Sequence, residues 1–132
     1  MSSTVSLDFQ YTTSIEKVWS ALTDSGKLAQ WVMENDFKAV EGHRFQFRTT
    51  PSEWWNGIVD SEVLVVDAPN RLSYTWVSGG EKNTVTWTLQ DLGNGKVSLH
   101  LEQSGIENAK VLEGAKYGWT KMCGDLENVL NP

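Results

Sequence analysis

The sequence predicts an α+β fold in which a curved antiparallel sheet of six to seven strands surrounds a long C-terminal helix. Two observations support this prediction. The segment from Glu107 to Leu130 repeats apolar residues at helical spacing, whereas most of the chain before it alternates apolar and polar residues, as strands do. A length of 132 residues suits one hydrophobic core, so we expect a single domain over residues 1–132.

The predicted C-terminal helix carries one apolar stripe, with Cys123 and Leu130 at its edge. The stripe contains Leu112, Ala115, Trp119, Met122, Leu126 and Val129. Isolated helices owe most of their stability to packing, so we expect this stripe to lie in the concave face of the sheet. Gly114, Gly118 and Gly124 each cost roughly 1 kcal/mol relative to alanine. They indicate close approach to the sheet, some flexibility of the helix that admits a ligand, or simple neutrality.

The N-terminal part of the chain predicts one strand and then two short helices. Apolar side chains alternate over residues 5–11, which is typical of a half-buried strand. Thr13 and Glu16 have the spacing of a capping box, with Thr13 as the N-cap. A second short helix follows the polar break at 23–26 and includes Leu28, Trp31 and Val32.

The middle of the chain predicts the remaining strands. A weak one covers residues 37–40, and the clearer ones cover 43–48, 59–66, 72–76, 85–89 and 97–101. Clean alternation is typical of antiparallel strands with one solvated face. The alternation slips at 64–66, which indicates a bulge. Turns are predicted at 68–70, 79–80 and 93–95.

Composition excludes several classes of protein. The net charge of -6 opposes binding to a phosphate backbone, so we expect no nucleic-acid partner. No apolar run approaches the roughly 20 residues that span a membrane, and the N-terminus lacks a signal-peptide pattern. Cys123 is the single cysteine, which favours a reducing, cytoplasmic location. Neither histidine has a partner at metal-ligand spacing, and no nucleotide-binding loop is present, so we expect no metal and no cofactor.

Tryptophan is unusually frequent. The seven are Trp19, Trp31, Trp54, Trp55, Trp76, Trp87 and Trp119. Each large aromatic side chain can bury roughly 150–250 Å², and seven exceed what a small core usually needs. Either some of them line a cavity between sheet and helix, or they divide between core and surface. For the cavity, the candidate ligand-binding residues are Trp31, Phe45, Phe47, Val59, Tyr74, Trp76, Trp87, Trp119 and Met122.

Few residues are candidates for catalysis. His43 shares the inward parity of Phe45; it is either a general base or, as we favour, a histidine satisfied by local hydrogen bonds. His100 has outward parity and no assigned role. Cys123 lacks a recognisable nucleophile arrangement and is interpreted as a small core residue. We therefore assign no catalytic residue. The Trp54-Trp55 loop is a lid, a partner-docking spot, or a loop packed back onto the body.

Several segments, spread over nearly the whole chain, carry a resemblance to a known family. They are IEKVWSAL, KLAQW, EGHRFQFR, WNGIV, APNRLSYTW, VTWTL with the following GNGKVSL, and YGWTKMCGDLENVL. In this order and spacing they resemble the activator-of-Hsp90-ATPase homologue (AHSA1-like) family of the START/Bet v 1-like (SRPBCC) superfamily. The resemblance implies a helix-grip fold with a hydrophobic cavity; members resemble lipid or polyketide binders, drug-sequestering proteins and cyclases. The co-chaperone that names the family is larger and has a second domain, so Hsp90 binding is the weakest of these expectations.

We therefore expect a small cytoplasmic protein that holds an apolar or aromatic small molecule between its sheet and its C-terminal helix without converting it. One alternative is a cyclase- or hydrolase-type enzyme that uses the same cavity, with His43, Tyr74 or Ser61 as its polar group. The other is a stress- or chaperone-linked module that binds proteins through Trp54-Trp55. The sequence determines neither the ligand nor the oligomeric state.

Overall fold

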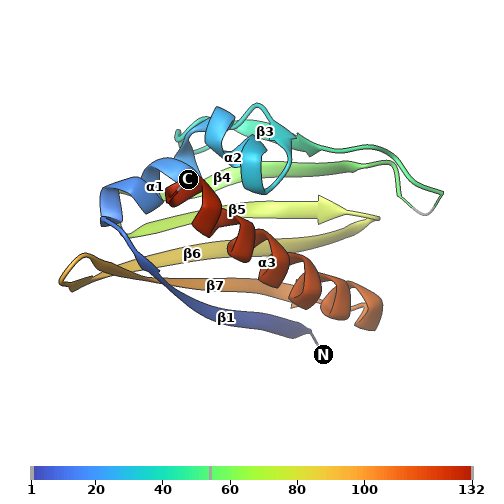
Figure 1. Cartoon of the computed structure of the whole chain (residues 1–132). Helices are drawn as coiled ribbons and strands as arrows, with labels where there is room; N and C mark the ends of the chain where they lie inside the picture. Colours follow the sequence, from blue (N-terminus) through green and yellow to red (C-terminus); the bar gives the residue numbers. More distant parts are fainter. Residues whose placement is uncertain (1, 54, 132) are drawn as a thin grey trace.

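The computed structural model describes residues 2–53 and 55–131 and shows a seven-stranded antiparallel sheet curled around a long helix (Figure 1). The strands are β1 (Ser3–Thr12), β2 (Glu34–Asn35), β3 (Arg44–Arg48), β4 (Ile58–Asp67), β5 (Arg71–Ser78), β6 (Glu81–Gly93) and β7 (Lys96–Ile106). The helices are α1 (Ile15–Thr23), α2 (Ser25–Trp31) and α3 (Ala109–Leu130). In the sheet the order is β1-β7-β6-β5-β4-β3-β2. The predicted α+β fold class is confirmed.

Tight hairpins set the register of the central strands. Gly79 and Gly80, with φ of 60° and 82°, form the two-residue turn between β5 and β6. Such turns need positive φ at both positions, which glycine adopts without strain. The resulting register opposes Tyr74 to Val85 and Trp76 to Asn83. The predicted bulge in β4 is confirmed, because its pairing with β5 shifts between residues 63 and 65.

The two short helices are confirmed, but the first begins differently from the prediction. Ser14, not Thr13, is the N-cap of α1, and its hydroxyl accepts a hydrogen bond from the Lys17 backbone N–H at 3.3 Å. The predicted N-cap, Thr13, was therefore one residue too early in the chain. Asp24 caps α2 by accepting from the Lys27 N–H at 3.0 Å. Both helices lie at one end of the sheet (Figure 1).

The predicted weak strand at 37–40 is wrong. The strand in this region is β2 instead, which begins at Glu34, three residues before the predicted start. It pairs with β3. The ladder ends at Asp36 because its carboxylate, rather than a backbone carbonyl, accepts the Gln46 N–H at 2.8 Å. Phe37 nevertheless enters the core from irregular backbone, with its ring centroid 5.1 Å from that of Phe45.

Helix α3 lies diagonally across the concave face of the sheet (Figure 1). It begins two residues later than predicted, because Asn108 is the N-cap and accepts from the Lys110 N–H at 2.8 Å. The preceding N–H groups of Glu107 and Asn108 donate to one oxygen of Glu81 on β6, at 2.9 and 3.0 Å. Burial opposes ionisation of Glu81, but these bonds and one from Asn83 hold the pKa of its carboxyl below the usual range.

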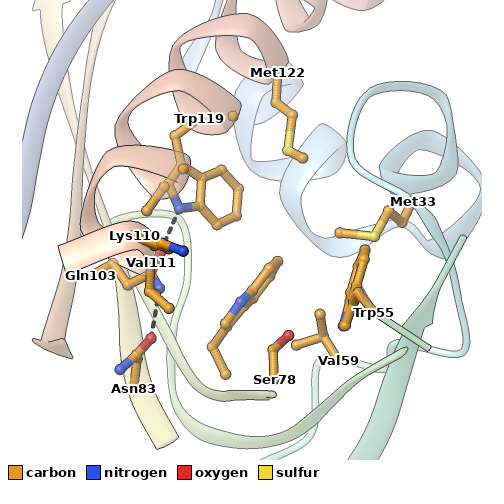
Figure 2. Close-up of a pocket in the computed structure, with 14 residues that line it drawn as sticks. Met33, Trp55, Val59, Ser78, Asn83, Gln103, Lys110, Val111, Trp119 and Met122 are labelled. Atoms are coloured by element: carbon orange, nitrogen blue, oxygen red, sulfur yellow. Dashed lines mark hydrogen bonds between the residues drawn. The ribbon is translucent and has the colours of Figure 1, made fainter. Parts of the chain in front are cut away.

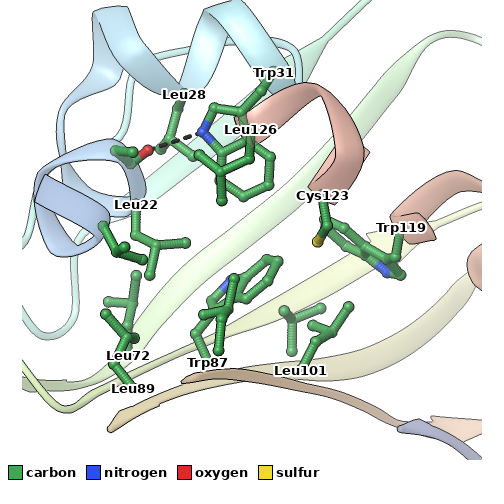
Figure 3. Close-up of a cluster of buried hydrophobic side chains, with 14 of the residues drawn as sticks. Leu22, Leu28, Trp31, Leu72, Trp87, Leu89, Leu101, Trp119, Cys123 and Leu126 are labelled. Atoms are coloured by element: carbon green, nitrogen blue, oxygen red, sulfur yellow. Dashed lines mark hydrogen bonds between the residues drawn. The ribbon is translucent and has the colours of Figure 1, made fainter. Parts of the chain in front are cut away.

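The core lies between the sheet, α1, α2 and the C-terminal half of α3 (Figure 3). Trp87 is at its centre, with ring centroids 5.7 Å from Trp31 and 5.3 Å from Trp119. The Trp87 Nε1–H donates to the Tyr74 hydroxyl at 2.9 Å, and burial raises the pKa of that phenol. The buried residues of α3 are Trp119, Cys123, Leu126 and Leu130. Cys123 and Leu130, which were predicted at the edge of the apolar stripe, therefore lie at its centre.

The outer face of the sheet carries ion pairs between its charged side chains. Arg44 pairs with Glu62 at 3.3 Å, and Arg48 pairs with Asp36 at 3.5 Å. Both pairs are exposed to solvent, and exposed pairs contribute little to stability. No helix in the described part of the chain is long and apolar enough to cross a membrane.

His100 on this face should make stability depend on pH. Hydrogen bonds to Glu102 at 3.1 Å and Asp8 at 2.7 Å raise the pKa of its imidazole above the ordinary 6.5. The folded state therefore holds the proton more tightly than the unfolded state. This stabilisation is complete below about pH 6.5 and is lost as the pH rises through the folded-state pKa.

We expect His100→Gln to lower the free energy of unfolding more at about pH 5.5 than at about pH 8.5. Urea unfolding at the two pH values measures this difference, and an NMR titration of the imidazole measures the pKa directly. An equal effect of the substitution at both pH values would contradict the prediction.

Candidate functional site

A pocket of about 490 Å³ opens beside the N-terminal half of α3 (Figure 2). Side chains from α3, from β4 to β7, from the β3–β4 loop and from the segment after α2 surround it. The lining residues are Met33, Trp55, Val59, Trp76, Ser78, Asn83, Gln103, Lys110, Val111, Gly114, Ala115, Gly118, Trp119 and Met122. The sheet and helix therefore do not fill the whole space between them.

The pocket exists at this end of α3 because the helix presents small residues there. Nothing lies within 4 Å of a Cβ built at Gly114, Gly118 or Gly124. Close approach to the sheet, one of the three interpretations of these glycines, is therefore wrong. Gly114 and Gly118 border the pocket, so flexibility of the helix that admits a ligand remains an interpretation for these two.

Aromatic rings form the walls of the pocket. The ring centroids of Trp76 and Trp119 are 5.0 Å apart with a tilt of 59°, and Trp76 also packs on Phe47 at 5.3 Å. Figure 2 shows Trp55 on the opposite side of the pocket from α3, next to Met33. These surfaces suit an apolar or aromatic ligand.

Two buried amides form the polar part of the lining. Gln103 and Asn83 are 2% and 3% exposed. The Trp119 Nε1–H donates to Gln103 Oε1 at 2.7 Å, and Gln103 Nε2 donates to Asn83 Oδ1 at 2.8 Å (Figure 2). Asn83 Nδ2 donates in turn to Glu81 at 3.1 Å and to the Gly105 carbonyl at 3.0 Å. The network connects the pocket to the start of α3.

Sequence reasoning missed both amides, although a signal for them existed. Asn83 has the inward parity of Val85, and Gln103 has that of Leu101. A polar residue at an inward position needs a hydrogen-bond partner and so indicates a polar site within the core.

The β3–β4 loop places Trp55 by backbone geometry. Gly57 has φ of 77°, and a Cβ there would lie 2.3 Å from the Thr49 carbonyl oxygen, so only glycine fits. The backbone N–H groups of Thr49 and Ser52 donate to the carbonyls of Gly57 and Trp55, both at 2.8 Å. Trp55 packs inward and lines the pocket, whereas the prediction for Trp54 lies outside the described residues.

The structure divides the nine predicted ligand-binding residues into two groups. Val59, Trp76, Trp119 and Met122 line the pocket. The others are buried in the core and outside the lining; they are Trp31, Phe45, Phe47, Tyr74 and Trp87. Other aromatic rings cover them. Trp31 on α2 packs on Trp87, with ring centroids 5.7 Å apart. Phe37 packs on Phe45 at 5.1 Å and on Tyr74 at 6.3 Å. The Trp31 Nε1–H donates to the Ala21 carbonyl at 3.0 Å and so fixes α2 against α1.

The residues considered for catalysis lie away from the pocket. His43 forms a hydrogen bond between Nε2 and the Asp36 carbonyl at 3.0 Å, as the favoured interpretation predicts. Ser61 is buried, lies beside a hollow on the outer face, and its hydroxyl has no partner among the described residues. Burial raises the pKa of the Cys123 thiol to about 12, which keeps it protonated. The described lining contains no carboxylate, imidazole or thiol.

A curled antiparallel sheet that grips a C-terminal helix beside an apolar pocket is the helix-grip architecture of START/Bet v 1-like, or SRPBCC, proteins. Small ligand-binding domains and polyketide cyclase-like domains use this fold. The chain belongs to the family described as "Activator of Hsp90 ATPase homolog 1-like protein", whose model matches residues 12–131.

Solved structures agree with this assignment. The protein MLL2253 from Mesorhizobium loti is 36% identical, with a TM-score of 0.88 over 98% of this chain and 97% of that one. BH1534 from Bacillus halodurans is 30% identical, with a TM-score of 0.80 over 98% and 97% of the two chains. The Aha1 dimer from Colwellia psychrerythraea is 15% identical over 97% and 96%, and its TM-score of 0.82 shows a shared fold alone. No curated protein matches the chain.

Proposed function

We propose that the chain works as a single-domain cytoplasmic protein that binds an apolar or aromatic small molecule in this pocket without converting it. The observation that carries the proposal is the aromatic wall formed by Trp76, Trp119 and Trp55 around open space. Their rings come from β5, α3 and the β3–β4 loop, so a bound ligand would contact three separate elements. The buried rings beneath them support this wall and need not touch the ligand.

The volume and the lining support a ligand of moderate size. About 490 Å³ lies within the range of roughly 300–1,000 Å³ that small-molecule sites occupy. Such sites are mostly apolar and use a few polar groups to orient the ligand. A molecule of two or three fused rings matches this description.

The chemistry of the lining favours binding over catalysis. General acid–base catalysis needs a titratable group within hydrogen-bond reach of the substrate. Among the described lining residues, Lys110 alone is charged, and it lies in the exposed first turn of α3. The amides of Asn83 and Gln103 are engaged with each other and do not titrate. The pocket therefore has the means to orient a ligand and lacks an evident proton-transfer pair.

An aromatic ligand should stabilise the protein and perturb its tryptophan emission. A ligand that binds only the folded state adds about 2.7 kcal/mol at a concentration a hundred times its Kd. We expect hits from a library of fused-ring compounds to raise the melting temperature and to shift backbone NMR signals of residues 110–122. The absence of any such hit would contradict the proposed function.

Incubation of each hit with the protein, followed by mass spectrometry, tests for conversion. We expect no product, and we expect His43→Ala to leave the Kd nearly unchanged because His43 lies outside the pocket. Catalytic product formation by the wild type would overturn the binding proposal and favour an enzyme of the cyclase or hydrolase type.

A further inference from the structure

Two hydrogen-bond donors on β5 are unpaired and accessible in the candidate pocket. Trp76 and Ser78 share the inward face of this strand, two residues apart, and both line the space. Neither the Trp76 Nε1–H nor the Ser78 hydroxyl makes a hydrogen bond in the described part of the chain. Both side chains are only partly buried, whereas the fully buried unpaired atoms of the described residues are Trp55 Nε1 and Ser61 Oγ. A ligand can therefore reach the two donors on β5.

The other polar side chains of the lining are less available to a ligand. The amide oxygens of Asn83 and Gln103 each accept one hydrogen bond and keep a second lone pair. However, these two side chains are at most 3% exposed, so little of either amide meets the open space. The described lining also contains no carboxylate. Accessible donors therefore outnumber accessible acceptors in this pocket.

The opposite side of the pocket is apolar. Figure 2 shows Met33, Trp55 and Met122 across the space from Asn83 and Gln103. Thioether sulfur is a weak acceptor, and the Trp55 N–H is buried. This side suits the body of a ring system, while an acceptor atom suits the side next to β5. The pocket is therefore built to orient a molecule with one polar edge.

We propose that the ligand is a neutral aromatic ketone: a fused-ring molecule whose ring carbonyl oxygen lies beside β5 and accepts hydrogen bonds from the Ser78 hydroxyl and the Trp76 N–H. This inference rests on the proposed function, since it concerns the same pocket. The rings of the ligand extend toward Met33 and Met122. Binding exchanges hydrogen bonds to water for hydrogen bonds to the protein, so each of these bonds adds a modest gain in affinity.

Three neutral probes of nearly the same shape test this assignment. Fluorenone carries an acceptor at the bridge between its two benzene rings, carbazole carries a donor there, and fluorene carries neither. Titration followed by two-dimensional NMR, at one fixed solvent composition, gives the Kd of each probe. Because the three probes differ in hydration, the quantity to compare is the ratio of the variant Kd to the wild-type Kd for each probe.

Two substitutions on β5 remove the proposed donors. Ser78→Ala should raise the Kd of fluorenone about fivefold, the size of effect that a single hydrogen bond supports, and change the Kd of fluorene and carbazole less than about twofold. Trp76→Phe keeps an aromatic ring but loses contact area, so its effect on fluorenone should exceed its effect on fluorene by about fivefold. Ser98→Ala is the control, because Ser98 lies on the outer face of β7 and outside the lining. It should leave the Kd of all three probes unchanged.

The results separate this inference from the proposed function. A loss of affinity that is selective for fluorenone in either β5 variant would support the ketone assignment. Equal effects on the three probes, or a larger effect on carbazole, would overturn it while the binding function stands. Failure of fluorenone to bind, while other fused-ring compounds of the library do bind, would also overturn it. Failure of all three probes and of the whole library would overturn both proposals.

Discussion

Replacing Trp119 with alanine is expected to lower the free energy of unfolding by about 3–5 kcal/mol, the range for large aromatic truncations in a core. The side chain is 3% exposed and packs against Trp76 and Trp87. The substitution also removes the donor to Gln103, which leaves a buried amide oxygen without a partner. Chemical denaturation followed by far-ultraviolet circular dichroism measures the change.

Tyr117 provides the matched control on the same helix. Its side chain is 75% exposed, so Tyr117→Ala should change the free energy of unfolding by less than about 0.5 kcal/mol. Trp119→Phe removes the N–H together with part of the indole, so its effect is an upper limit on the contribution of the hydrogen bond to Gln103. A loss below about 1 kcal/mol for Trp119→Ala would mean that the ring is not a core residue, and the placement of α3 on the sheet would be wrong.

Gly118→Trp is expected to abolish ligand binding, with a rise in Kd of at least about a hundredfold, or ~2.7 kcal/mol. Gly118 borders the pocket and has open space where a side chain would begin, so an indole there would occupy the volume that the ligand needs. The fold should tolerate the change, because tryptophan has a higher helix propensity than glycine. Calorimetric titration measures the Kd, and thermal unfolding verifies that the variant is folded.

Gly124→Trp is the control for this substitution. Gly124 is exposed on α3, also has open space around its Cβ position, and does not line the pocket. It should retain wild-type affinity. Unchanged binding by a folded Gly118→Trp protein would show that the ligand occupies another place, and a loss of binding in both variants would point to a general effect on the helix.

Most of the fold could be predicted from the sequence because its apolar residues recur with two clear periods. A repeat near 3.6 gave α3 to within two residues, and a repeat of two gave the strands of the central sheet. The errors occurred where side chains replace backbone partners. Ser14 rather than Thr13 caps α1, and Asp36 ends the β2–β3 ladder, so the segment at 37–40 is not a strand.

The candidate site was less predictable. Alternation along a strand indicates which face of the sheet a side chain occupies, but it does not indicate what packs over that side chain. Trp76 and Trp87 share the concave face, yet Trp76 borders the pocket and Trp87 is buried under α2 and Trp31. The aromatic character of the site followed from composition. The inclusion of Trp55 depended on a loop whose shape requires Gly57, which no periodicity reveals.

The sequence by itself determined the three helices, every strand except β2, the inward face of those strands, and the family to which the chain belongs. The tertiary structure alone decided where the interior stays open. Helix α2 and the larger side chains in the second half of α3 fill one end of the concave face, whereas Gly114 and Gly118 leave the other end unfilled. The same packing brings Asn83 and Gln103 to the edge of that space, because a polar side chain on the concave face acquires its partners only when the helix is seated.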